Sequence, residues 1–241
     1  MGRFHRDDAR AFVSRAIAPG VGVWLAILGI GALLTGPFRG LARDEEAVNR
    51  VLADERNPTW NTITMLWSHI GNTEYVIGVC VLVTAVLLWR TRDWRWSVVP
   101  AIAISLQATI FVIATAIIGR PRPTVEHLDP APPTSSYPSG HVGASTALYL
   151  VLALMAGRIA RPWLRWLTTV LCLLLPLLVT YARLYRGMHH VTDVAVGMLN
   201  GIGCALLAYG WWRHRSRAAS AEQLPAPVVP VVQPRGAGEQ A

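Results

Sequence analysis

Histidines, arginines and one aspartate gather in a short segment between two strongly apolar runs of the sequence. The segment RLYRGMHHVTD, residues 183–193, places His189 and His190 side by side. Arg183 lies six residues before His189, and Asp193 lies four residues after it. Ionisable side chains beside membrane-spanning runs are costly to bury and usually have a function. The segment is therefore the first candidate for a catalytic or binding site.

Two further polar segments, GRPRP at 119–123 and YPSGH at 137–141, also lie at the ends of apolar runs. The guanidinium group of an arginine such as Arg122 or Arg183 matches phosphate oxygens in a bidentate way. Ser139 and Gly140 come where a helix is expected to begin, and the backbone N–H groups there favour an anion. The three segments together predict a phosphate-binding site.

Two histidines can divide the work of phosphoryl transfer. One attacks phosphorus and the other protonates the leaving oxygen, while arginines stabilise the charge of the transition state. The attacking imidazole must be neutral, and a carboxylate bonded to its other nitrogen fixes the required tautomer. His189 and Asp193 have i,i+4 spacing, and His190 and Asp193 have i,i+3 spacing, so both histidines remain candidates on spacing alone.

The apolar runs that must position these residues predict an all-α, polytopic membrane protein. The chain of 241 residues is 53% hydrophobic and only 15% charged, which is apolar for a soluble domain. About 20 apolar residues cross a bilayer as a helix. The sequence predicts a bundle of six transmembrane helices, at 17–37, 73–89, 97–119, 139–157, 166–185 and 191–212.

The formal charge of +8 comes from arginine alone, because the sequence contains no lysine. A nucleic-acid-binding protein can be equally basic, but here the arginines cluster between apolar runs, which indicates membrane topology. With six spans, all four clusters fall on one face, and the positive-inside rule makes that face cytoplasmic. We therefore expect a multi-pass protein of the cell membrane with both termini in the cytoplasm and no nucleic-acid partner.

The remaining segments complete the predicted organisation. Residues 1–16 form a cytoplasmic N-terminal segment, 17–212 the membrane domain, and 213–241 a disordered cytoplasmic tail rich in proline and alanine. Residues 39–72 carry apolar side chains at helical spacing and predict short amphipathic helices on the outer membrane surface.

At this point the sequence resembles the type 2 phosphatidic acid phosphatase family, membrane lipid phosphatases related to vanadium haloperoxidases and bacterial acid phosphatases. The family's signatures are Lys-x6-Arg-Pro, Pro-Ser-Gly-His and Ser-Arg-x5-His-x3-Asp. The chain matches the end of the first at Arg122-Pro123 and the whole of the second at 138–141. It matches the third at Arg183, His189 and Asp193, with the family's spacing.

The resemblance implies a role for each matched residue. His189 is expected to be the nucleophile, oriented by Asp193, and His141 the general acid. The expected phosphate ligands are Arg122, Arg183, Ser139 and Gly140. His190 falls where the family tolerates variation and is interpreted as a neighbour of the site. The substrate implied is a lipid phosphate, such as phosphatidate, phosphatidylglycerol phosphate or a polyprenyl pyrophosphate such as undecaprenyl pyrophosphate, with no cofactor.

Two positions depart from the signatures. Thr115 stands where the first signature has lysine, and Ala182 stands where the third has serine. Loss of the lysine removes a phosphate-binding charge, and we hypothesise that Arg186, or else Arg120, supplies part of it. If Arg186→Ala changed neither turnover nor substrate affinity, this hypothesis would be wrong.

Other functions are also compatible with the pattern. A transferase of the same fold would give acceptor-dependent products, and a lipid-binding or transport protein with a decayed site would bind without releasing phosphate. A zinc site could draw on the histidines and on Asp129 and Asp193, but the sequence lacks a compact ligand motif. The neighbouring arginines also oppose a cation and suit an anion, so no metal is expected.

Overall fold

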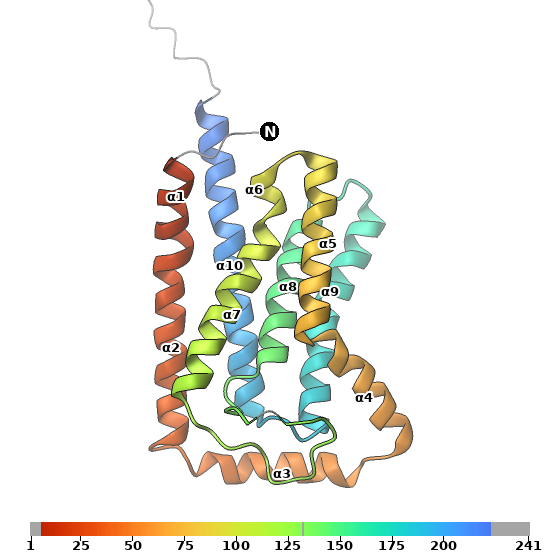
Figure 1. Ribbon diagram of the computed structural model, residues 1–241. Coiled ribbons are helices and arrows are strands. Elements are labelled where there is room, and N and C mark those ends of the chain that lie inside the picture. Colours follow the sequence, from red (N-terminus) through yellow and green to blue (C-terminus); the bar gives the residue numbers. More distant parts are fainter. Residues whose placement is uncertain (1–5, 132, 223–241) are drawn as a thin grey trace, which may run out of the picture.

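The computed structural model describes residues 6–131 and 133–222, and within them the chain folds into helices joined by loops (Figure 1). This confirms the predicted all-α class. A π-helical stretch at Val13–Ile17 links the first two helices. The helices are α1 (Arg6–Phe12), α2 (Ala18–Thr35), α3 (Leu41–Asp54), α4 (Pro58–Ile70), α5 (Thr73–Thr91), α6 (Trp94–Ser97), α7 (Val99–Ile117), α8 (Gly140–Ala156), α9 (Pro162–Tyr185) and α10 (Val191–Glu222).

Five helical segments in the described part of the chain are long and apolar enough to cross a membrane. They are Arg6–Thr35, Thr73–Thr91, Trp94–Ile117, Pro162–Tyr185 and Val191–Ser220. The remaining predicted span corresponds to α8, which is apolar but has only 17 residues. At 1.5 Å per residue α8 is about 26 Å long, somewhat less than a typical hydrocarbon core. It packs against α7, α9 and α10, and most of its residues are buried.

The two ends of the membrane domain differ from the predicted boundaries. Residues 6–16, expected to lie outside the first span, form one continuous helical segment with α2. Residues 213–222 of the predicted disordered tail are helical, because α10 extends to Glu222, and residues 223–241 lie outside the described part. Asp8 of α1 is fully buried and forms ion pairs with Arg95 and Arg215. Its Oδ2 lies 2.9 Å from Nη2 of Arg95, and its Oδ1 lies 2.7 Å from Nε of Arg215, so the carboxylate joins α1 to α6 and α10.

The amphipathic helices predicted between residues 39 and 72 are present as α3 and α4. Asn57 accepts a hydrogen bond from the N–H of Trp60 at 3.0 Å, and Pro58 occupies the first turn, so α4 begins there. Figure 1 shows α3 lying across one end of the bundle, while α4 descends obliquely beside α9. The start of α1 and the end of α10 lie at the opposite end.

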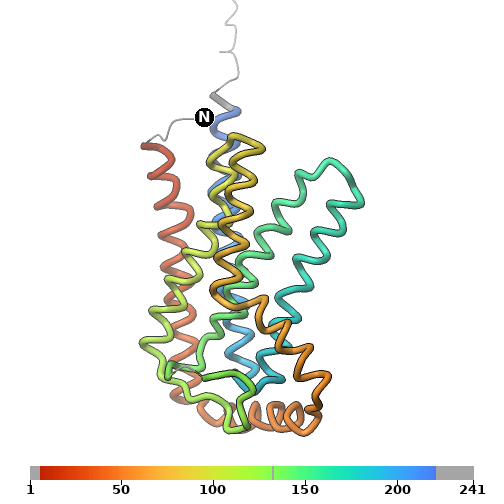
Figure 2. Tube along the Cα trace, turned by 45° about the vertical axis from the view of Figure 1, so that its right-hand side comes forward, coloured from red at the N-terminus to blue at the C-terminus, as the bar shows by residue number. Residues whose placement is uncertain are grey.

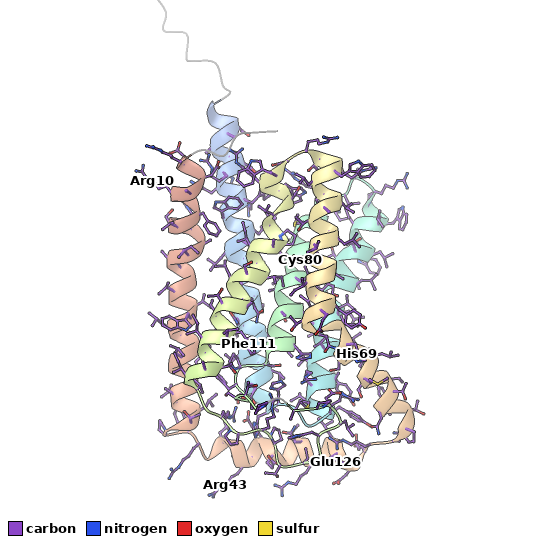
Figure 3. All side chains as sticks on the ribbon, in the orientation of Figure 1. Arg10, Arg43, His69, Cys80, Phe111 and Glu126 are labelled. Carbon is purple, nitrogen blue, oxygen red and sulfur yellow. The ribbon has the colours of Figure 1, made fainter. Side chains whose placement is uncertain are left out.

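The loop between α7 and α8 and the turn between α9 and α10 lie at the end that α3 covers. Figure 2 shows the same arrangement after a rotation of the molecule. The three polar segments of the sequence are therefore brought to one end of the bundle, as predicted. In Figure 3, one end of the bundle is marked by Arg10, and the opposite end, which α3 covers, is marked by Arg43 and Glu126.

Close packing of α8 against α10 holds the second polar segment, residues 137–141, against the backbone of α10. A Cβ atom added at Gly197 of α10 would lie 2.5 Å from the carbonyl oxygen of Ser139. A Cβ at Gly201, one turn further on, would lie 2.5 Å from Cβ of Thr146 and 2.6 Å from the carbonyl oxygen of Gly143. Glycine at these positions lets the two helices approach until their backbones touch.

We expect Gly197→Ala to destabilise the fold and to lower activity, because the methyl group must push the backbone at Ser139 away from α10. Overpacking of this kind costs about 1–3 kcal/mol. Gly210→Ala on the same helix is the matched control, since nothing lies within 4 Å of its added Cβ. Thermal unfolding in detergent measures the difference, and equal midpoints for the two variants would contradict the packing argument.

Candidate active site

A cavity of about 560 Å³ opens among α4, α5, α7, α8 and the loop before α8. Its lining includes residues of all three signature segments, namely Arg122, Gly140, His141, Arg183 and His189. The remaining wall contains apolar side chains of α5, α7 and α8, including Val76, Ile77, Ile104, Ala108, Phe111, Val112 and Ala144. Figure 3 marks two lining residues, His69 and Phe111, both in the half of the bundle nearer α3.

His189 lies in the turn between α9 and α10 and is 4% exposed. Its Nδ1–H donates to the carbonyl oxygen of Ser136 at 2.8 Å, since a carbonyl can only accept. Nε2 is then the nitrogen with a free lone pair. Burial and the positive charge of Arg183 lower the pKa of His189 well below its ordinary value. His189 is therefore a neutral imidazole in the tautomer that a nucleophile requires.

Asp193 does not make the direct contact with His189 that the i,i+4 spacing suggested. Helix α10 begins at Val191, so His189 lies before the helix and the two residues do not share a helical face. Oδ2 of Asp193 instead accepts from the backbone N–H of His190 at 2.9 Å and from the hydroxyl of Ser136, and it lies 3.2 Å from Nδ1 of His190, the i,i+3 pair. Asp193 is thus linked to His189 through Ser136, whose hydroxyl donates to Asp193 and whose carbonyl oxygen accepts from Nδ1 of His189.

His141 stands in the first turn of α8 and lines the same cavity. Its Nε2 lies 2.8 Å from Oδ1 of Asn72, the residue that precedes α5. The amide oxygen accepts from the imidazole N–H and so fixes the plane of the ring. Asn72 was not among the residues predicted from the sequence, because nothing near it matches a known motif.

Three of the four predicted phosphate ligands, Arg122, Arg183 and Gly140, line the cavity, whereas Ser139 does not. Arg122 donates from Nη1 to the carbonyl oxygen of Met188 at 2.8 Å, while its Nε has no hydrogen-bond partner among the described residues. The buried Nε of Arg183 and the buried hydroxyl of Ser139 are in the same state. Gly140 begins α8, and an added Cβ there would lie 2.8 Å from the ring of Phe111. The Nε atoms of Arg122 and Arg183 are therefore potential donors for an anion in the cavity.

The carboxylate of Asp129, from the loop before α8, forms ion pairs with two arginines near the cavity. Its Oδ2 lies 2.8 Å from Nη1 of Arg183, and its Oδ1 lies 2.7 Å from Nη2 of Arg186. Ser68 of α4 donates to the same carboxylate at 3.3 Å. Burial alone would raise the pKa of Asp129, but the hydrogen bond from Arg186 and the charges of both arginines lower it overall. Asp129 is therefore ionised and lies in the cavity wall.

Arg186 and Arg120, the two candidates for the missing lysine charge, do not line the cavity. Arg186 is buried, and it donates to the carbonyl oxygens of Asn61 and Leu128 as well as to Asp129. Arg120 is buried between Glu45 and Asp193. Thr115, at the lysine position itself, donates its hydroxyl to the carbonyl oxygen of Tyr137 at 3.2 Å. Each cation has a structural partner, so the cavity holds less free positive charge than expected.

The histidines and acidic residues near the site were the possible ligands of a zinc ion. Among the described residues, no group of three or more His, Cys, Asp or Glu side chains has the arrangement of a metal site. His127, one of the possible ligands, contacts the carbonyl oxygen of Pro123 at 2.9 Å.

Comparison with known proteins agrees with this geometry. The family model described as "PAP2 superfamily" matches residues 96–217, which contain the signature segments and four of the membrane helices. The chain belongs to the PAP2 superfamily. The resemblance found in the sequence is thereby confirmed for the part of the chain that carries the three signature segments.

Two solved structures and one curated protein are similar to this PAP2 chain. Phosphatidylglycerophosphatase B of Bacillus subtilis (strain 168) is 24% identical over 170 residues, 69% of this chain and 82% of the relative. The crystal structure of a transmembrane PAP2-type phosphatidylglycerolphosphate phosphatase from Bacillus subtilis superposes with a TM-score of 0.71 at 22% identity, covering 81% of this chain and 96% of the other. Aquifex aeolicus LpxE gives a TM-score of 0.54 at 20% identity, covering 68% and 93%.

We expect Asn72→Ala to lower the turnover number of this PAP2 protein by about tenfold while changing KM much less. The imidazole of His141 would lose the hydrogen bond that fixes its ring, and misplaced catalytic groups lose rate more than binding. Steady-state kinetics with a lipid phosphate in detergent give both constants. A rise in KM with unchanged kcat would instead make Asn72 a binding residue.

We expect Asp129→Asn to tighten the binding of inorganic phosphate, roughly threefold or more, because Arg183 would keep a charge that Asp129 now neutralises. The fold should become less stable, since Arg183 and Arg186 would face each other without the carboxylate between them. Glu126→Gln, an exposed change in the same loop, is the control. Competitive inhibition by phosphate measures the affinity, and weaker inhibition of the Asp129 variant would contradict the competition.

Proposed function

We propose that the protein is an integral membrane lipid phosphatase that hydrolyses a phosphomonoester or pyrophosphate of a lipid. Membership of the PAP2 superfamily supports a membrane phosphatase. The observation that carries the lipid substrate is the composition of the cavity lining, which divides into the polar side chains of Arg122, Arg183, His141 and His189 and the apolar side chains of α5, α7 and α8. A ligand with a phosphate head and an acyl or prenyl tail has the same division.

The apolar wall reaches the surface that the helices present to the bilayer. Ile77 of α5 and Val112 of α7 line the cavity and are also 49% and 58% exposed. A lipid tail could therefore remain in the membrane while its headgroup enters the cavity. Phosphatidate, phosphatidylglycerol phosphate and undecaprenyl pyrophosphate all fit this description. The names of the two Bacillus relatives make phosphatidylglycerol phosphate the first substrate to test.

In the proposed mechanism, Nε2 of His189 attacks phosphorus and the bond from phosphorus to the lipid oxygen breaks. His141 enters this step as the imidazolium: its Nε2–H stays bonded to Asn72, and its Nδ1 proton passes to that oxygen. The lipid then leaves as an alcohol, or as a lipid monophosphate when the substrate is a pyrophosphate. Arg122 and Arg183 neutralise charge on the phosphoryl oxygens. His141 then accepts a proton from water, which attacks the phosphohistidine, releases phosphate and restores neutral His189.

The hydrolysis needs no metal ion in this scheme, because the arginines and histidines supply the positive charge and the proton. The site is proposed to face the outside of the cell membrane. Its support is the distribution of arginines, since the clusters at 90–95, 158–165 and 213–217 lie at the ends of helices away from α3. The termini would then lie in the cytoplasm.

We expect the purified protein to release phosphate from a panel of lipid phosphates in detergent with EDTA present. His189→Ala should lose at least about a thousandfold in rate, as expected for a nucleophile, and rapid quenching of the wild type should trap a phosphohistidine. His214→Ala, far along α10, is the matched control and should retain full activity. Loss of activity on EDTA treatment would refute metal independence.

Two other results would change the function itself. Phosphate transfer to an added alcohol in preference to water would indicate a transferase of the same fold. Binding of a lipid phosphate without turnover would indicate a binding or transport protein. The second outcome would make Thr115 decisive, because its hydroxyl is engaged with Tyr137 and adds no charge to the cavity.

A further inference from the structure

Helix α3, which crosses the end of the bundle, contributes a buried carboxylate to the active-site region. Glu45 is only 6% exposed, although it lies on a helix whose neighbouring residues face the surface. Its Oε1 accepts from the backbone N–H of Thr192 at 2.7 Å, and its Oε2 accepts from the Thr192 hydroxyl at 3.1 Å. Thr192 is in the first turn of α10, where the helix dipole also favours a negative charge.

Arg120 connects Glu45 to Asp193. Its Nη2 donates to Oε2 of Glu45 at 2.6 Å, and its Nη1 donates to Oδ1 of Asp193 at 2.5 Å. The arginine side chain is 3% exposed, and the two carboxylates are 7% and 0% exposed. The guanidinium group is thus shared between two buried anions, and each anion limits how closely Arg120 approaches the other.

A continuous path of bonds runs from α3 to the imidazole of His189. Asp193 accepts the hydroxyl proton of Ser136, and the carbonyl oxygen of Ser136 accepts Nδ1–H of His189. Glu45 acts on this path through Arg120, without touching His189 or lining the cavity. A change at Glu45 would therefore alter the orientation of the nucleophile rather than the phosphate ligands.

A second residue of α3 reaches the same segment by an independent contact. Asn49, one turn after Glu45 and 1% exposed, donates from Nδ2 to the carbonyl oxygen of His189 at 3.1 Å. The same amide lies 3.4 Å from the carbonyl oxygen of Leu184 at the end of α9. Asn49 thus bonds to the backbone of His189, while Glu45 is connected to the imidazole ring through Arg120, Asp193 and Ser136.

We propose that α3 is a positioning element of the active site, in which Glu45 and Asn49 hold His189 in its attacking geometry. The inference rests on the proposed phosphatase function. Without Glu45, Arg120 would pair with Asp193 alone and draw it away from Ser136. The hydrogen bond that keeps the proton on Nδ1 of His189 would then weaken, and a smaller fraction of molecules would present a free Nε2.

The test compares Glu45→Ala, Glu45→Gln and Asn49→Ala with Asp44→Asn, an exposed acidic residue on the same helix. We expect kcat to fall about 10- to 100-fold in Glu45→Ala, because small misplacements of a catalytic group have effects of this size. Glu45→Gln should fall between Glu45→Ala and the wild type, since it keeps the shape and one acceptor. Asp44→Asn should match the wild type.

The inhibition constant of inorganic phosphate distinguishes a positioning role of Glu45 and Asn49 from a purely structural one. Arg122 and Arg183 are not altered in these variants, so this constant should stay within about twofold of the wild type while kcat falls. The fraction of folded protein is measured for each variant, and rates are expressed per folded molecule. Asn49→Ala repeats the test through the independent contact if the Glu45 variants fold poorly.

Each other result overturns the proposal. Unchanged kcat in Glu45→Ala and Asn49→Ala, or a parallel loss of kcat and phosphate affinity, would refute the positioning role alone. A wild type that releases no phosphate from any lipid would refute the proposed function and the positioning role with it.

Discussion

The buried carboxylate of Asp193 is the interaction on which the site depends. A desolvated charge is stable only when donors surround it, and removal of one partner leaves the other uncompensated. Asp193 receives donors from three separate segments, namely Arg120 beside the first signature, Ser136 before the second, and the backbone of His190 in the third. The energetic need to satisfy one anion thereby brings together the chain segments that bear His141 and His189.

Positive charge is distributed unequally among the arginines of this region. Arg120 is held by two carboxylates, and Arg183 and Arg186 share Asp129. Arg122 donates to a backbone carbonyl, and no ion pair is seen for it among the described residues. An incoming phosphate therefore meets Arg122 as the least neutralised cation, and it competes with an internal carboxylate for Arg183. The same electrostatics suit a site that binds a phosphate dianion and must also release it after hydrolysis.

Much of this architecture follows from local sequence. Each apolar run became a helix because its backbone polar groups must bond within the helix in a bilayer, whatever its neighbours are. The amphipathic helices α3 and α4 follow equally from local periodicity. The i,i+4 argument for Asp193 failed because it assumed that α10 included His189, whereas the helix begins at Val191. Arg186 was hypothesised to supply part of the charge lost with the lysine of the first signature, but its guanidinium group bonds to Asn61, Leu128 and Asp129 outside the cavity lining.

The sequence by itself determined the all-α class, the order of the helices, and the residue types at 122, 141, 183 and 189 that can perform phosphoryl chemistry. Their chemical identity and spacing are local properties of the chain. Only the tertiary structure decided which partner each of them has. Asn72, Ser136, Asp129 and Glu45 contact the site from positions 53 to 75 residues away from their bonded partners, with separations of 69, 53, 54 and 75. No periodicity records such pairings, because they arise when separate helices pack and buried polar groups must find partners.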